Sequence, residues 1–171
     1  MSMRVYIPRD AGAVAVGADD IAVAFEAIAA KRSVALEIVR TGSRGMYWLE
    51  PMVEVATANG RVAFGPATVD DVATLFDAMV ADAPHALRLG IADEIPWLKR
   101  QTRLTFKNCG VIDPRSIDDY KAHDGYKGLT RALTLGTDGV LDDVTNSGLR
   151  GRGGAGFPTG IKWKTVAPTS A

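Results

Sequence analysis

The alternation of apolar and polar residues over the first 80 positions predicts a small sheet with helices packed on it. Residues 3–8 and 33–40 are rich in β-forming side chains and predict two strands. Between them, Asp19-Asp20 offers an N-cap to a helix. The apolar positions of this helix are Ile21, Ala24, Phe25, Ile28 and Ala29. A strand, a helix and a strand in this order indicate two parallel strands joined by a right-handed crossover.

A hairpin and a second helix complete this pattern. Residues 51–57 and 61–64 are alternating runs on either side of Asn59-Gly60, a strong hairpin signal because both residues tolerate positive φ. Thr68 then opens a helix, with Asp71 as its capping-box partner. The apolar face of that helix comprises Val69, Val72, Leu75, Phe76 and Met79. The predicted order is β-α-β-β-β-α.

A connector is predicted next. Pro84, Gly90 and Pro96 interrupt regular structure, and Trp97 is a candidate aromatic anchor. Residues 103–109 alternate basic with apolar side chains, which favours an extended conformation.

Three helices are predicted after residue 115. Ser116, with Asp119 three positions later, caps a short one. Residues 125–135 carry apolar side chains at helical spacing, and a further helix begins at Thr137. Gly148 stands at the C′ position that ends that helix.

Composition narrows the functional classes. Apolar residues make up 47% of the 171 positions, enough for a hydrophobic core. Lys+Arg and Asp+Glu both number 20, which disfavours a nucleic-acid binder because such a protein needs an excess of cations. No apolar run is long enough to span a membrane and the N-terminus has no export signal, so we expect a cytoplasmic protein without membrane partners.

Cys109 is the only cysteine in the sequence. A single thiol excludes an internal disulfide, and it excludes a four-cysteine iron–sulfur cluster or zinc site within this chain. We expect Cys109 to be a small, buried or half-buried residue, since it has no partner thiol.

The candidate chemistry lies in a glycine-rich loop after the last predicted helix. Five glycines fall within ten residues, at positions 151, 153, 154, 156 and 160. Glycine allows positive φ, and successive free backbone N–H groups form a concave nest for phosphate. Arg150, Arg152 and Lys162 add positive charge, and Phe157 and Trp163 offer flat faces on which a ring system can stack. A phosphate cradle beside aromatic faces suits a nucleotide.

The pattern alone leaves other interpretations open. Gly151, Gly153 and Gly156 fit G-x-G-x-x-G, but a Rossmann fingerprint follows a strand and this loop follows a predicted helix. A Walker A loop is excluded because no Gly-Lys-Ser/Thr follows. A flexible linker remains, as does an Arg-Gly-Gly nucleic-acid segment, which the zero net charge disfavours.

A longer match favours the nucleotide. Residues 147–163 (SGLRGRGGAGFPTGIKW) resemble the opening of the flavin- and NADH-binding domain in the family of large diaphorase subunits, and residues 101–119 (QTRLTFKNCGVIDPRSIDD) resemble its lead-in segment. The family includes the NADH-binding subunit of respiratory complex I, the diaphorase of NAD-linked hydrogenase, and the beta subunit of NAD-dependent formate dehydrogenase.

The resemblance implies that the loop cradles FMN and borders an NAD(H) pocket, with Lys162 near the flavin phosphate and Phe157 stacked on NAD(H). The implied cofactor-binding residues are Gly151, Arg152, Gly153, Gly154, Ala155, Gly156, Phe157, Gly160 and Lys162. In such proteins hydride passes between the nicotinamide and the flavin, which exchanges single electrons with iron–sulfur clusters, while the protein positions the rings. No catalytic residue or metal ligand is predicted in this chain.

The resemblance ends near Val166, and neither the acidic flavin-site segment nor the cysteines of the family's [4Fe-4S] cluster occur. We therefore expect the chain to be part of a longer protein, with that cluster in the missing C-terminal part. Alone, it is expected neither to bind FMN tightly nor to turn over.

Residues 4–80 resemble the thioredoxin-like ferredoxin domain that often accompanies this family. That domain holds a two-iron cluster on two cysteine pairs, whose positions fall here on Pro8 with Ala13 and on Ser43 with Tyr47. None of these residues supplies a thiolate. A domain of this kind without its cluster resembles that of formate dehydrogenase beta subunits. We expect it to be a docking scaffold, with a fold-stabilising extension as the alternative.

The expected architecture is α/β: a thioredoxin-like domain over residues 1–82, a connector over 83–136, and the start of the FMN/NADH-binding diaphorase domain over 137–171. The expected function is that of the diaphorase subunit of an NAD-dependent formate dehydrogenase (formate + NAD+ = CO2 + NADH). Its expected partners are a metal-containing alpha subunit and a small [2Fe-2S] gamma subunit. Two alternatives stay open: a sister diaphorase of complex I or NAD-reducing hydrogenase, and a non-catalytic docking module.

Overall fold

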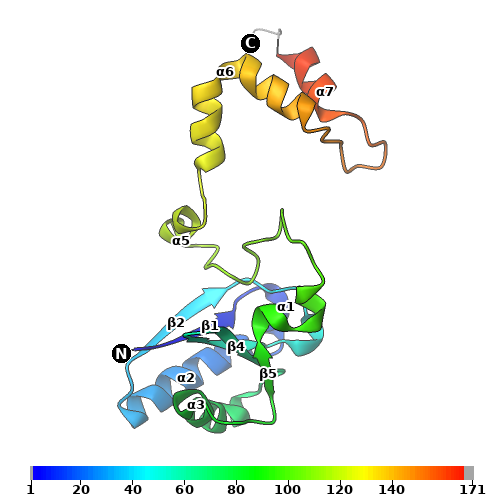
Figure 1. Ribbon diagram of the computed structural model, residues 1–171. Helices are drawn as coiled ribbons and strands as arrows, with labels where there is room; N and C mark the ends of the chain where they lie inside the picture. Colours follow the sequence, from blue (N-terminus) through cyan, green and yellow to red (C-terminus); the bar gives the residue numbers. More distant parts are fainter. Residues whose placement is uncertain (1, 168–171) are drawn as a thin grey trace. The chain divides into compact units, whose positions relative to one another are not determined.

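The computed structural model describes residues 2–167, and the chain forms two compact units that divide between His123 and Asp124. In the described range, the N-terminal unit (2–123) holds every strand and the C-terminal unit (124–167) is helical (Figure 1). No helix among these residues is both long enough and apolar enough to cross a membrane.

The N-terminal unit is built on one mixed sheet in the order β2-β1-β3-β4-β5. Its strands are β1 (Met3–Pro8), β2 (Leu36–Thr41), β3 (Val53–Thr57), β4 (Gly60–Phe64) and β5 (Arg88–Ile91). β1 and β2 are parallel, and every other neighbouring pair is antiparallel. The parallel pair and the hairpin at Asn59-Gly60 are confirmed. A strand–helix–strand unit followed by a hairpin and a helix, in this strand order, is thioredoxin-like, as expected.

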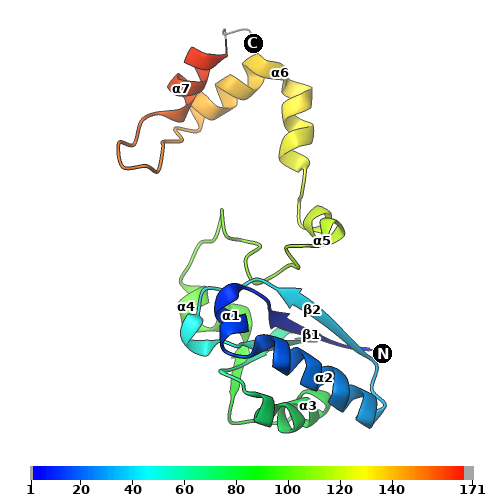
Figure 2. The same ribbon diagram turned by 180° about the vertical axis from the view of Figure 1, so that it is seen from behind.

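Two helices cover one face of this sheet. α2 (Ala18–Arg32) and α3 (Val72–Ala81) lie side by side (Figures 1 and 2). The rings of Phe25 and Phe76 join them, with centroids 6.3 Å apart. Both rings are buried in one core with strand residues, among them Val5, Ile7, Val53 and Phe64. Each such side chain contributes about 1.5–3 kcal/mol on burial, so this core holds the unit together.

The start of α2 differs from the prediction. The helix begins after Gly17, which has a φ of 100°, and Asp19 and Asp20 lie in its first turn, where carboxylates favour the helix dipole. The reason is an additional short helix, α1 (Ala11–Ala15), whose N-cap is Asp10. A turn at residues 16–17 separates α1 from α2, and glycine adopts its left-handed conformation without steric cost.

The start of α3 follows the prediction in part. Thr68 and Asp71 form the expected capping box. Val69, expected on the buried face, is 46% exposed because it belongs to the 3-10 turn η2 (Val69–Asp71) that precedes the helix.

The segment after α3 is more ordered than the expected connector. β5 adds a fifth strand to the sheet, antiparallel to β4. The expected anchor Trp97 lies in α4 (Pro96–Lys99) but is 54% exposed, and its neighbour Leu98 is buried instead.

Residues 103–109 are not extended. Residues 104–110 instead form a bend followed by consecutive turns, in which the Cys109 amide donates to the Phe106 carbonyl at 3.0 Å. Cys109 is exposed, which corrects its expected burial. Ser116 caps α5 (Ile117–Ala122) by accepting from the Asp119 amide, as predicted.

The C-terminal unit contains α6 (Lys127–Asn146) and α7 (Thr159–Val166), which pack together. α6 is interrupted at Gly136, whose φ of 69° and ψ of 180° are not helical, so the two predicted helices are confirmed. Gly148 follows the C-cap with a φ of 65°, as the C′ position requires.

Candidate nucleotide site

The glycine-rich loop joins α6 to α7 and is closed at its base. An isolated antiparallel bridge pairs Arg150 with Pro158, and its two backbone hydrogen bonds are both 2.9 Å long. Above the bridge, Arg150 Nη1 donates to the carbonyl of Gly156 at 3.0 Å. The loop therefore holds its shape through bonds that use mainly its carbonyl groups.

The tip of the loop leaves its amides available. Residues 152–155 are exposed, and within the described range no hydrogen bond is donated by the backbone amides of residues 152–157. Gly154 and Gly156 have φ values of 99° and 60°, on either side of Ala155, which is not left-handed. An alternation of handedness with free N–H groups is the backbone pattern of an anion-binding nest.

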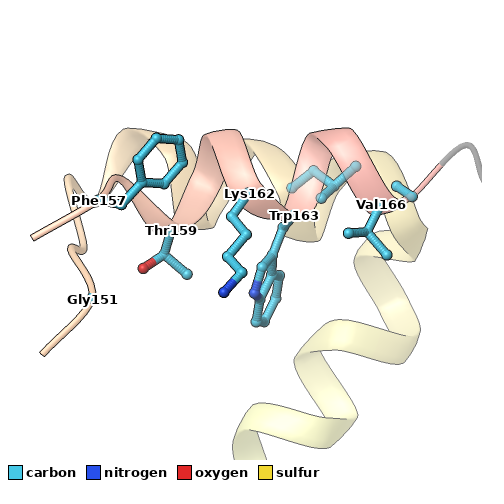
Figure 3. A pocket seen from close by; sticks show the side chains of 8 residues that line it. Gly151, Phe157, Thr159, Lys162, Trp163 and Val166 are labelled. Carbon is cyan, nitrogen blue, oxygen red and sulfur yellow. The ribbon is translucent and has the colours of Figure 1, made fainter. Parts of the chain in front are cut away.

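A pocket of about 670 Å³ lies beside this loop, within the size range of small-molecule sites. It is lined by Leu141, Gly151, Phe157, Thr159, Lys162, Trp163, Val166 and Ala167. Lys162 and Trp163 extend from α7 in the same direction (Figure 3). Phe157 is 54% exposed and Trp163 46% exposed, so both rings have faces free for a flat ligand.

The charge at the pocket comes from one lysine. Lys164 pairs with Asp142 at 3.2 Å, whereas no carboxylate in residues 2–167 pairs with Lys162. An ammonium without a carboxylate partner favours an anion, and aromatic faces in the same pocket favour a ring attached to it.

The structure brings together three of the nine predicted cofactor residues, because Gly151, Phe157 and Lys162 line the same pocket. Residues 152–156 form the adjoining loop tip and do not line it. Their contact with a cofactor remains a prediction. Leu141 and Thr159 were not expected at the site. The helical spacing before the loop places Leu141 on the apolar side of its helix, but it does not show that α6 packs against α7.

Gly160 has a structural explanation of its own. It is the only buried residue of the described C-terminal unit, and a Cβ atom there would lie 2.5 Å from Thr145 Oγ1 and 2.6 Å from Thr145 Cα. The glycine allows α7 to approach α6 closely, so no ligand is needed to explain it.

The residues at this site fit the phosphate and ring of FMN, but the N-terminal unit does not fit an iron–sulfur cluster. Of the four positions where the resemblance placed cysteines, Ala13 is buried in the core and Tyr47 is 68% exposed. Ser43 donates its hydroxyl to Glu50 Oε1 at 2.8 Å. Burial raises the pKa of the Glu50 carboxyl despite hydrogen bonds from Met52 and Ser43. A polar network of uncharged and acidic groups stands here, with no thiolate to bind iron.

Comparison with known proteins gives matches to part of the chain. No protein-family model matches. NADP-reducing hydrogenase subunit HndC of Solidesulfovibrio fructosivorans is 63% identical over 65 residues, which are 38% of this chain and 13% of that protein. One NADH-quinone oxidoreductase subunit of Streptomyces coelicolor is 53% identical over 51 residues, 30% of this chain and 11% of that protein. The chain thus spans a small fraction of the relatives it matches.

Among solved structures, the thioredoxin-like [2Fe-2S] ferredoxin from Aquifex aeolicus aligns with a TM-score of 0.47 at 17% identity, over 56% of this chain and 96% of that one. The strand order and connections of the N-terminal unit define its thioredoxin-like fold without this alignment. By sequence, the chain shares a segment with subunits of two kinds of oxidoreductase, NADH-quinone oxidoreductase and NADP-reducing hydrogenase.

Proposed function

We propose that the C-terminal unit supplies part of a flavin and NAD(P)(H) site in an electron-transfer subunit. The observation that carries the proposal is the open pocket of Phe157, Lys162 and Trp163 beside a loop in which the amides of residues 152–157 donate no hydrogen bond within the described range. The relatives support it, because their names describe oxidoreductases that use NADH or NADP.

Each part of the site has a separate task in this proposal. The amides of residues 152–157 and the Lys162 ammonium bind the phosphate of FMN. Phe157 and Trp163 cover ring faces and keep water from them. Arg150 keeps the loop closed through its bond to Gly156. Bound FMN would accept hydride from the reduced nicotinamide or return it to the oxidised one, and would exchange single electrons with iron–sulfur clusters. The chain would position the rings.

The larger assembly is proposed to be a hydrogenase or a complex I-type enzyme, because the matching relatives are of those kinds. A formate dehydrogenase is the second candidate. One observation favours it. The positions of the cluster cysteines hold Pro8, Ala13, Ser43 and Tyr47, and a domain of this kind without its cluster resembles that of formate dehydrogenase beta subunits. Purification of the tagged chain with its native partners distinguishes these assemblies. We expect reduction of NAD(P)+ by hydrogen, or reduction of quinone by NADH. Reduction of NAD+ by formate would support the second candidate instead.

Flavin binding is tested by comparing FMN with riboflavin, which lacks the phosphate. We expect weak, saturable quenching of flavin fluorescence by the 171-residue chain, stronger for FMN than for riboflavin. Lys162→Gln should lower the ratio of the FMN affinity to the riboflavin affinity about tenfold, which corresponds to about 1.4 kcal/mol of binding free energy. Lys121→Gln, an equal charge change in the other unit, is the control. Equal binding of FMN and riboflavin, or no effect of Lys162→Gln, would refute a phosphate site.

A further inference from the structure

Three of the exposed large aromatic side chains of the N-terminal unit lie on two short elements; Phe106 and Tyr120 are also exposed, on other segments of the unit. Tyr47 and Trp48 belong to the 3-10 turn η1 (Tyr47–Leu49), and Trp97 belongs to α4. They are 68%, 58% and 54% exposed, and the rings of Trp48 and Trp97 meet edge to face at 5.3 Å. We define these three residues as the aromatic patch. Exposed large aromatics in contact are unusual on a free surface and are enriched at the centre of protein interfaces.

The aromatic patch is held by a core of its own. Beneath it, a second buried cluster joins η1, the sheet and α4; its buried members are Met46, Met52, Ala63, Ala92 and Leu98. Leu98 anchors α4 directly beside Trp97, and the Gln101 side chain donates to the Trp97 carbonyl at 3.0 Å. Because the backbone under the rings is fixed, little conformational entropy is lost when a partner covers them.

Basic residues follow Trp97 along the chain, beginning at the end of α4. Residues 95–112 contain four basic residues and no Asp or Glu, in a chain whose net charge is zero. Lys99 pairs with Glu94, but neither Arg100 nor Arg103 has an acidic partner in the described range. Arg103 instead donates to the backbone carbonyl of Arg44 at 3.3 Å, which fixes its position. We define Arg100 and Arg103 as the basic edge.

We infer that the aromatic patch and the basic edge form a docking surface for a protein partner with an acidic border around an apolar centre. A polyanion such as a lipid surface or a nucleic acid fits less well, because Asp93 and Glu94 lie in the same region, and the Asp93 side chain is 80% exposed. A protein can present a cation to these carboxylates and acids to the arginines, which a uniform polyanion cannot do. The inference uses the N-terminal unit alone and does not depend on the proposed nucleotide site.

Photo-crosslinking in the producing cells identifies the partner. A benzoylphenylalanine replaces Tyr47, the most exposed of the three rings, and the crosslinked protein is sequenced and purified. Its binding to the chain is then measured by calorimetry at several salt concentrations. Arg100→Glu with Arg103→Glu should weaken binding about tenfold or more, with a smaller effect at high salt. Lys31→Glu with Arg115→Glu, the same charge change on other exposed positions, should leave the affinity unchanged.

Several outcomes would overturn the inference. They are the absence of a crosslinked protein, crosslinking only to a second copy of this chain, or a partner whose affinity is indifferent to reversal of the basic edge. Anionic phosphatidylglycerol vesicles and a single-stranded oligonucleotide are tested in parallel. If either binds the wild-type chain through the basic edge and no protein does, the surface recognises a polyanion and not a protein.

Discussion

Arg44 and Glu54 form a bidentate ion pair inside the N-terminal unit, with Nε 2.5 Å from Oε1 and Nη2 2.9 Å from Oε2. Their side chains are 5% and 4% exposed. Burial opposes the charge of Arg44, but Glu54 and Asp93 outweigh it, so the pKa of Arg44 is raised. The pair ties the segment after β2 to the middle of the sheet.

Removal of one member of this pair should destabilise the unit strongly. Glu54→Ala leaves Arg44 buried with only its exposed partner Asp93, and we predict a loss of about 3–5 kcal/mol in the free energy of unfolding, measured with urea. Asp93→Ala removes an exposed partner of the same arginine and should cost about 1 kcal/mol or less. Similar small losses for both variants would show that the pair is not important for stability.

Close packing of α7 on α6 depends on Gly160. Gly160→Ala places a methyl group within 2.6 Å of Thr145 atoms, so the helices must separate, and we predict a cost of about 1–3 kcal/mol. Separation of the helices should appear as faster hydrogen exchange of the α7 backbone amides in the variant than in the wild type. Gly153→Ala is the matched control, since nothing lies within 4 Å of a Cβ there. Unchanged protection in Gly160→Ala would contradict the packing role.

The buried carboxyl of Glu50 should make stability depend on pH. Its pKa is raised in the folded state, so the folded protein binds this proton more tightly than the unfolded chain, whose ordinary value is about 4.3. The stabilising contribution of Glu50 is then fully present when the pH is below its pKa in the unfolded chain. It is lost as the pH rises through its pKa in the folded protein.

A variant without the ionisable group isolates this effect. The free energy of unfolding of the wild type minus that of Glu50→Gln should fall as the pH is raised from about 4. Glu26→Gln, an exposed position on α2, controls for loss of a carboxylate. A difference that is flat or rises with pH would contradict the prediction.

Local signals in the sequence were sufficient for much of the fold. The Asn59-Gly60 hairpin, the Thr68 capping box and the Gly148 stop each depend on neighbours within a few residues, and each is present. β5 (Arg88–Ile91) could not be predicted in the same way, because its four residues carry little alternation and include a glycine, and it pairs with β4 only in the folded sheet.

The same distinction holds at the candidate site. Gly151, Phe157 and Lys162 belong to one continuous stretch, so the composition of the loop placed them together. The contact of Gly160 with Thr145 and the entry of Leu141 into the pocket depend on how two helices pack. Helical spacing shows which side of a helix is apolar, but it does not identify the element that this side meets.

Phosphate binding by the loop amides is tested most directly by nuclear magnetic resonance of the isotope-labelled chain, titrated with FMN and, separately, with inorganic phosphate and riboflavin. We predict that the amide signals of residues 152–157 shift with FMN and with phosphate, and that riboflavin shifts chiefly the Trp163 indole. If FMN leaves these amides unshifted, or shifts only residues of the N-terminal unit, the loop is not a phosphate cradle.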